Sequence, residues 1–92
     1  MEKDQFLQIV QSLVEGFEKP DFQEALKSAK ARGDIEKLLM LPTSLQAAVF
    51  ASYGLEPTAA MAAFKEAGRK YAMEPEAGPF MARMRQALAV IS

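Results

Sequence analysis

Two prolines and a glycine divide the stretch 41–71 into two apolar runs, and this division constrains the fold more than any other feature. Pro42 and Pro57 suit first-turn helix positions, because the N–H that proline lacks has no intrahelical partner there. Gly54 can take the left-handed conformation that ends a helix, with Leu55 packing back on the turn before it. The spacing therefore predicts a helical hairpin with arms at about Pro42–Tyr53 and Pro57–Met73.

Apolar periodicity and terminal residues predict two helices before this hairpin. The first is expected to begin with Asp4 as its cap and to end near Phe17. Pro20 opens the second, Gly33 ends it, and Asp34 then caps a short segment, Ile35–Leu41. The competing interpretation is one helix over 20–40 that tolerates the glycine at a cost of about 1 kcal/mol. We prefer the break, because glycine followed by aspartate is typical of one helix ending and another beginning.

A last helix is expected to begin near Pro79, after the Glu74–Pro79 turn, and its apolar positions reach Ile91. No run alternates over strand length, so no sheet is expected. The sequence therefore predicts one all-α domain over residues 1–92, a compact bundle of four main helices plus one short helical turn. Its connections suit an up-and-down or an orthogonal arrangement. Gly68 falls on an apolar helix face, where we expect it to permit close packing.

The chain has neither histidine nor cysteine, which removes the commonest general base, the best nucleophile and the main transition-metal ligands. We therefore expect no enzyme, no metal site and no cofactor. Glu74 and Glu76 form the most conspicuous acidic pair, and we interpret them as capping residues of the last helix. The net charge of −1, with 11 basic and 12 acidic residues, predicts no binding to nucleic acid or membranes. The N-terminus carries no apolar leader, so a cytoplasmic location is expected.

Methionine is in excess, with six in 92 residues, and several lie in the C-terminal half. Methionine suits adaptable binding grooves but fills irregular cores equally well. Ordinary core packing is the simpler interpretation. The functional alternative is an apolar surface on the last helix that binds another protein or a second copy of the chain. This partner interface would consist of Phe80, Met81, Met84 and Leu88.

Anchor residues at helix boundaries and in the expected core resemble the small eukaryotic protein "C-ten" family, whose human member is linked to corpus callosum development. The matching positions are Pro42, Gln46, Val49, Tyr53, Gly54, Phe64, Tyr71, Pro75 and Glu76. Each has an adequate structural reason to occupy its place. The resemblance implies a cytoplasmic helical domain with a regulatory or adaptor-like role, and it transfers no catalytic residue.

Two functions follow as hypotheses. The first is a non-enzymatic protein–protein interaction or adaptor module, which predicts a contiguous exposed apolar patch centred on the last helix or the first. The alternative is a carrier of a small molecule or lipid, with an apolar cavity between helices. That cavity would be lined by Tyr53, Met61, Phe64 and Met84.

Overall fold

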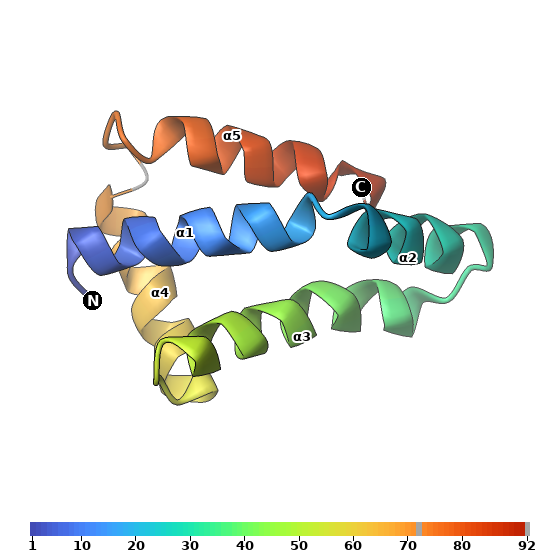
Figure 1. The fold of residues 1–92 in the computed structure, drawn as a ribbon, viewed down its shortest axis with the longest axis horizontal. Helices are drawn as coiled ribbons and strands as arrows, with labels where there is room; N and C mark the ends of the chain where they lie inside the picture. The colour runs from blue at the N-terminus through green and yellow to red at the C-terminus, as the bar shows by residue number, and fades with distance from the viewer. Residues whose placement is uncertain (72, 92) are drawn as a thin grey trace.

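The computed structural model describes residues 1–71 and 73–91, and it places α1 (Lys3–Phe17) at the centre of the molecule (Figure 1). α1 lies between α3 (Ile35–Ser52) and α5 (Gly78–Ala87), and α4 (Pro57–Tyr71) packs across one end of it. At the other end, α2 (Pro20–Ala31) packs against α3 and against the final 3₁₀ turn η1 (Ala89–Ile91). The described residues contain helices and turns but no strand, which confirms the all-α prediction.

α1 occupies the centre because its apolar residues cover more than one side of the helix. Six of them have no exposed surface, and α3, α4 and α5 cover them from different directions. They are Phe6, Ile9, Val10, Leu13, Val14 and Phe17. The start of the helix differs from the prediction. Glu2 occupies the N-cap position without a side-chain hydrogen bond. Asp4 lies in the first turn, where the helix dipole stabilises its negative charge.

Aromatic rings connect α1 to the α3–α4 pair. The Phe64 ring of α4 lies 5.1 Å from that of Phe6 in α1 and 5.7 Å from that of Phe50 in α3. Tyr71, at the end of α4, lies 5.9 Å from Phe6. Such tilted and edge-on ring pairs stabilise a core by about 0.5–1.5 kcal/mol each beyond their area burial. The aromatic cluster therefore fixes α4 across the N-terminal half of α1.

The break between α2 and α3 falls where the glycine predicts it. Gly33 has a φ of +70°, a conformation that glycine adopts without strain. The Asp34 side chain then caps α3 by accepting a hydrogen bond of 3.0 Å from the backbone N–H of Lys37. The alternative of one helix over 20–40 is therefore wrong.

Pro42 does not open a helix as predicted, because it lies inside α3. The expected short segment Ile35–Leu41 is the beginning of this helix, which continues without interruption to Ser52. A proline inside a helix removes one backbone hydrogen bond and crowds the carbonyl four residues earlier. The inner apolar face nevertheless runs through the proline, with half-buried leucines and a valine at spacings of three and four. These residues are Leu38, Leu41, Leu45 and Val49.

The turn after α3 is the predicted glycine-ended helix terminus. Gly54 has a φ of +74°. Its N–H donates to the carbonyl of Ala51, and the N–H of Leu55 donates to the carbonyl of Phe50. These two bonds form a Schellman motif, and the Leu55 side chain packs on the core. α3 and α4 meet at 97°, so the predicted hairpin is a right-angled corner and the bundle is of the orthogonal type. α4 ends at Tyr71, and Met73 lies outside it.

Close helix packing was predicted at Gly68, but it occurs at Gly16. A Cβ at position 68 would meet its nearest neighbour, Phe6 Cε1, at 4.0 Å, which is an ordinary contact. At Gly16 a Cβ would lie 2.8 Å from Leu45 Cδ2. Gly16 therefore permits the close approach of α1 and α3, whereas the Gly68 site has room for a methyl group.

The acidic residues before α5 do not cap it, contrary to the prediction. The N-cap residue of α5 is Ala77, which makes no side-chain hydrogen bond to the helix. The carboxylates of Glu74 and Glu76 lie 3.3 Å and 3.2 Å from Lys3 Nζ in α1. A cation on the neighbouring helix attracts both carboxylates away from the α5 terminus.

Replacing Pro42 with alanine tests the cost of the proline inside α3. The variant restores the N–H that can bond to the carbonyl of Leu38 and removes the ring clash. We therefore expect the free energy of unfolding to rise by up to about 3 kcal/mol. Urea denaturation followed by circular dichroism measures this change. A fall in stability would show that packing of the proline ring outweighs the helix defect.

Replacing Gly54 and Gly68 with alanine should change the free energy of unfolding in opposite directions. Gly54→Ala places a Cβ at positive φ and should lower the free energy of unfolding by about 1–2 kcal/mol. Gly68→Ala removes a helix-breaking residue where a methyl group fits, and should raise it by about 0.5–1 kcal/mol. Thermal unfolding of both variants beside the parent chain measures the two changes. Destabilisation by Gly68→Ala would contradict the space seen beside Phe6.

Candidate functional site

The outer side of α3 and the corner that follows it form a surface almost without charge. Residues 38–55 contain no Asp, Glu, Lys or Arg, and Glu56 is the only charged residue from position 38 to 64. The Glu56 carboxylate accepts hydrogen bonds from the backbone N–H groups of Ala59 (2.7 Å) and Thr58 (3.1 Å) at the start of α4. These bonds lower the pKa of Glu56 from its ordinary value, the one from Ala59 most. The single charge of this region is thus used to cap a helix.

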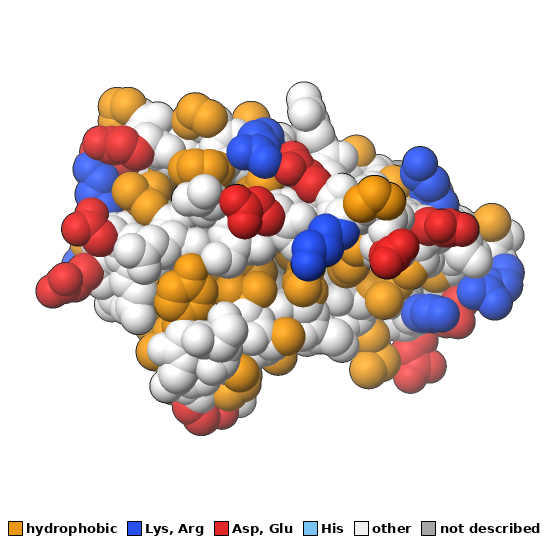
Figure 2. All heavy atoms as spheres, viewed as in Figure 1, with side chains coloured by type: hydrophobic (Ala, Val, Ile, Leu, Met, Phe, Trp, Pro, Cys, Tyr) orange, Lys and Arg blue, Asp and Glu red, His pale blue; other side chains and the backbone are white. Residues whose placement is uncertain are grey.

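α3 carries no charge from Leu38 to its end, yet Phe50 is its one fully buried residue. Helices of this composition normally lie inside a large protein or against another apolar surface. Figure 2 shows orange and white side chains over the middle of α3, with a red group at the lowest point below the corner, while red and blue gather over the other helices and at the ends. α3 is therefore more exposed in this chain than its apolar composition would predict.

Three large apolar side chains project from the first half of α3. Ile35 is 68% exposed, Leu39 62% and Met40 56%. Met73 is the other large apolar residue exposed to this degree among the described residues. Sequence reasoning did not assign a role to the three α3 residues, because their segment was interpreted as a short turn. A signal was present, since apolar residues at 35, 38, 39, 40 and 41 exceed what one helix face can hold.

An open apolar groove lies further along the same helix, at the α3–α4 corner. Its volume is about 320 Å³. Thr43 and Ala47 form the α3 wall, the buried Phe50 ring forms the floor, and the first turns of α4 supply the other wall. The residues of this α3–α4 groove are Thr43, Ala47, Phe50, Pro57, Thr58 and Met61. We call the exposed residues Ile35, Leu39, Met40 and Thr43, together with the half-buried Ala47, the α3 face.

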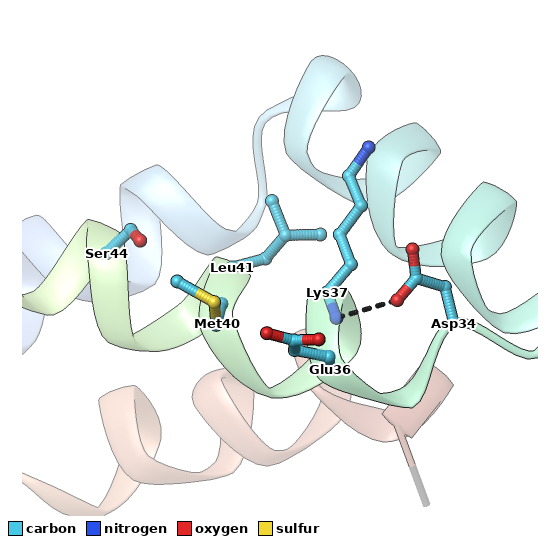
Figure 3. Close-up of a pocket in the computed structure, with 6 residues that line it drawn as sticks. All are labelled: Asp34, Glu36, Lys37, Met40, Leu41 and Ser44. Atoms are coloured by element: carbon cyan, nitrogen blue, oxygen red, sulfur yellow. Dashed lines mark hydrogen bonds between the residues drawn. The ribbon is translucent and has the colours of Figure 1, made fainter.

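A second hollow, of about 300 Å³, adjoins the start of the helix (Figure 3). All of its lining residues come from α3 and its cap, and Met40 and Ser44 lie one turn apart along it. Asp34 points at the backbone N–H of Lys37 and is used for capping. Asp34, Glu36 and Lys37 thus form a charged end to a helix that carries no charge from Leu38 onward.

The residues expected to form an interface on the last helix are half-buried and pack on the core. Phe80 and Met81 contact the cluster around Phe6, Met84 contacts both core clusters, and Leu88 contacts the cluster around Phe50. The first helix, the other expected centre of an apolar patch, has its large apolar residues buried except for the half-buried Leu7. The large exposed apolar residues lie instead on α3 and at Met73.

The positions that carry the family resemblance are distributed along the α3–α4 corner, the core and the α4–α5 turn. The Tyr53 hydroxyl lies 2.8 Å from Ser12 Oγ of α1, either atom being a possible donor, and it also lies 3.2 Å from the carbonyl of Gln8 as a donor. Gln46 is half-buried, and Pro75 is exposed in the turn. The remaining positions, described above, lie inside α3, at its glycine turn, in the core packing or in the ion pair with Lys3. They are Pro42, Val49, Gly54, Phe64, Tyr71 and Glu76.

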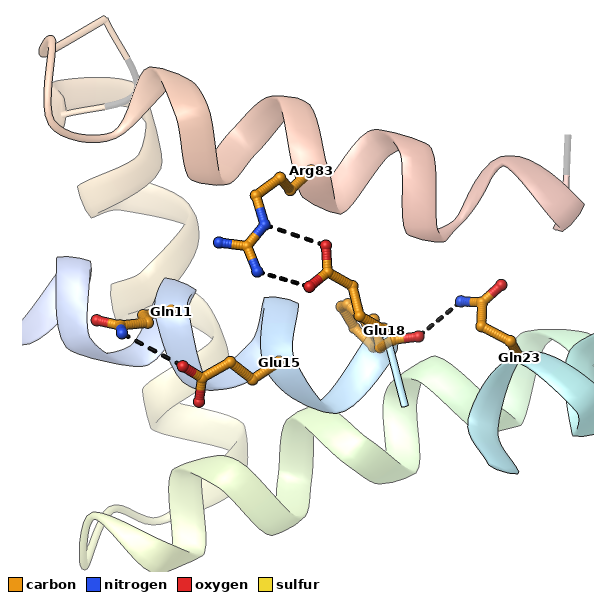
Figure 4. Close-up of polar contacts among 6 residues, drawn as sticks. Gln11, Glu15, Glu18, Gln23 and Arg83 are labelled. Atoms are coloured by element: carbon orange, nitrogen blue, oxygen red, sulfur yellow. Dashed lines mark hydrogen bonds and ion pairs between the residues drawn. The ribbon is translucent and has the colours of Figure 1, made fainter. Parts of the chain in front are cut away.

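The ion pairs between distant segments lie away from the α3 face: Lys3 of α1 pairs with the turn before α5, and Arg83 of α5 pairs with Glu18 after α1 (Figure 4 shows the latter). The Arg83 guanidinium donates hydrogen bonds of 2.6 Å and 3.1 Å to Glu18. These bonds lower the pKa of Glu18 and raise that of Arg83 from their ordinary values. Hydrogen bonds first to Glu76 and then to Glu74 likewise raise the pKa of Lys3. These shifts arise from ordinary surface ion pairs.

Two features of the described residues bear on other kinds of site. Over 1–71 and 73–91, no group of three or more His, Cys, Asp or Glu side chains is placed to hold a metal ion. None of the described helices is by itself long and apolar enough to cross a membrane. α3 and α4 pass that test together by length and composition, although the chain bends by 97° between them.

Comparison with family models, with curated proteins and with solved structures finds no match to this chain.

The Glu18–Arg83 pair predicts a specific dependence of stability on pH. Because the folded-state pKa of Glu18 is lowered, the pair stabilises the fold above the ordinary carboxyl value of 4.5. This contribution is lost as the pH falls through the lower folded-state value. Arg83→Gln should therefore unfold at lower urea than the parent near pH 7, with the difference shrinking toward about pH 3. Arg85→Gln, on the same helix, is the control, and an Arg83→Gln deficit that is independent of pH would contradict the prediction.

Proposed function

We propose that this chain is a non-enzymatic protein–protein interaction module, and that the α3 face with the adjoining α3–α4 groove is its docking surface. The observation that carries the proposal is the exposure of Ile35, Leu39 and Met40 on a helix without charge from Leu38 to its end. Several exposed large apolar residues on one helix are characteristic of a binding site, whereas single exposed apolar residues are normal.

The proposed docking surface has the anatomy that protein interfaces share. Depletion of charged residues at the centre distinguishes interface cores, and methionine is enriched there. Leu39 and Met40 provide projecting apolar side chains, and the groove provides an apolar recess with two threonine hydroxyls, of Thr43 and Thr58. Asp34, Glu36 and Lys37 at the beginning of α3 supply a charged rim.

The resemblance to the "C-ten" family supports the same function, since it implies an adaptor-like role in the cytoplasm without an enzymatic activity. The absence of histidine and cysteine from the chain also favours a binding role over catalysis. We propose a cytoplasmic location on these grounds. The surface expected on α5, with Phe80, Met81, Met84 and Leu88, is a weaker candidate because those side chains already pack on the core.

A carrier function is the second candidate, and one observation favours it. The volume of the α3–α4 groove falls at the lower end of the roughly 300–1,000 Å³ of ligand pockets. Of the four residues predicted to line a cavity, Met61 lines this groove, whereas the Phe64 ring packs against Phe6 and Phe50. Native mass spectrometry of the purified chain tests the idea. A retained small molecule would support a carrier, and the bare chain mass would argue against it.

The double variant Leu39→Asp with Met40→Asp tests the docking surface. It should weaken binding of the natural partner at least thirtyfold, because truncating central apolar residues of an interface costs about 2 kcal/mol or more. The side chains are exposed, so the free energy of unfolding should change by about 1 kcal/mol or less, from helix propensity. Affinity capture from native cells, quantified by mass spectrometry, measures the retained partners.

The matched control adds the same two charges elsewhere, as Gln86→Asp with Ala89→Asp, at exposed positions near the end of α5. This control should retain every partner of the parent chain. If the α3 variant stays folded and still captures the same proteins, the α3 face is not the docking surface. Circular dichroism of each variant shows whether it is folded.

A further inference from the structure

We propose that the partner of the α3 face is a second copy of this chain. The two α3 helices would lie antiparallel, crossing near Thr43, so that Leu39 and Met40 of each copy enter the α3–α4 groove of the other. This inference rests on the proposed docking role of the α3 face and names the protein that it binds.

The projecting residues and the groove lie on one side of one helix. Ala47, in the groove wall, follows Leu39 by eight residues and Met40 by seven. Because an α-helix advances about 100° per residue, Met40 lies within about 20° of Ala47 around the helix and Leu39 within about 80°. The projections therefore precede the groove by about 12 Å along the axis, at 1.5 Å per residue. A surface that carries both a projection and a recess on one side can complement itself.

Two-fold symmetry turns this arrangement into a closed pair. In such an interface, if residue i of one copy contacts residue j of the other, then j of the first contacts i of the second. The axis must pass midway between Leu39 and Ala47, which is Thr43. At that point the helices can approach closely, since Thr43, Ser44 and Ala47 are small. Each apolar contact is then made twice, and no recess remains open to a third copy.

The available area fits a dimer. An interface of standard size covers about 800 Å² per partner, which is about a seventh of the 5,784 Å² that the described residues of this chain expose. The segment Ile35–Met61, which holds the α3 face and the groove, makes up somewhat under a third of the chain. Fifteen of its 27 residues are exposed, which is about a sixth of the 92 residues of the chain.

The charges are also compatible with self-pairing. The paired centres carry no charge, because residues 38–55 have none in either copy, so no ion is stripped of water there. Glu36 lies at the edge of the α3 face. In the antiparallel arrangement it lies seven residues, or about 10 Å, from the crossing point, at the outer end of the interface.

A lipid surface is less favoured as the occupant. Helices that bind anionic membranes place Lys and Arg beside their apolar face, and this chain has no basic excess. Lys37 is the one cation in α3. Binding of the chain to vesicles would therefore argue against self-pairing.

Single cysteines test the crossing point, because the parent chain has none and any disulfide must join two copies. Thr43→Cys should form a dimer by mild oxidation at least tenfold faster than Gln86→Cys, an exposed site on α5. A disulfide requires Cβ atoms within about 3.5–4.5 Å, so rapid coupling at position 43 reports that the two α3 helices cross there. Equal rates at the two sites would overturn the crossing.

Introduced opposite charges test whether positions 39 and 40 of one copy lie opposite position 47 of the other. Leu39→Asp with Met40→Asp in one chain and Ala47→Lys in another should each weaken self-association at least tenfold. An equimolar mixture should recover a heterodimer. On one side of the axis the introduced carboxylates then meet the introduced ammonium group, and on the other side Leu39 still meets Ala47. Native mass spectrometry distinguishes the heterodimer by its mass. A mixture that stays monomeric while the parent dimerises would overturn the antiparallel register.

Sedimentation equilibrium of the parent chain from about 1 to 500 µM separates this inference from the proposed function. A dimer weakened by the Leu39→Asp, Met40→Asp variant supports both. A parent that stays monomeric overturns self-pairing, and the docking role then stands only if the capture experiment loses a different protein with that variant. Failure of both experiments ends both proposals. Co-sedimentation of the monomer with neutral phosphatidylcholine vesicles, lost in the same variant, would assign the α3 face to lipid and overturn self-pairing.

Discussion

Burial of α1 is the constraint on which the other elements depend. Its six fully buried side chains cover more of the helix circumference than one neighbour can shield, so three helices must pack around it. A chain of this size has few helices available, and α1 uses most of their apolar surface. α3 contributes its inner leucines and Phe50 to this core, and its outer side has no neighbour within the described chain. The same requirement that stabilises the fold therefore leaves an apolar surface uncovered.

Two local features determine how α3 lies on α1. Gly16 brings the helices close enough for Leu45 to contact the backbone region of α1, as the 2.8 Å separation from a virtual Cβ shows. The Tyr53 hydroxyl, 2.8 Å from Ser12 Oγ, joins the end of α3 to the middle of α1. The Schellman turn at Gly54 then directs α4 at 97° across α1 instead of along α3. That right angle opens the α3–α4 groove.

Much of the fold could be predicted from the sequence because local chemistry controls it. Gly33 and Gly54 take positive φ where the pattern requires it, and the apolar stripe of α1 correctly predicts a helix that ends near Phe17. Pro42 was misinterpreted because the preference of proline for the start of a helix is only local. Here, packing of the leucines before and after Pro42 on the core keeps α3 continuous through it. The candidate site could not be located for the same reason. Which side of an apolar helix stays exposed depends on how many neighbours reach it, and the sequence of α3 does not contain that information.

Methionine oxidation by dilute hydrogen peroxide tests most directly whether a partner covers the α3 face. Met40, at 56% exposure, lies on that face, whereas Met73, at 92%, lies outside it and serves as an internal reference. As the concentration of the chain rises, or a captured partner is added, oxidation of Met40 should slow severalfold while that of Met73 stays constant. Mass spectrometry of the digested chain resolves the two sites. Equal oxidation rates of Met40 in the dilute, concentrated and partner-bound chain would contradict the assignment of α3 as the binding surface.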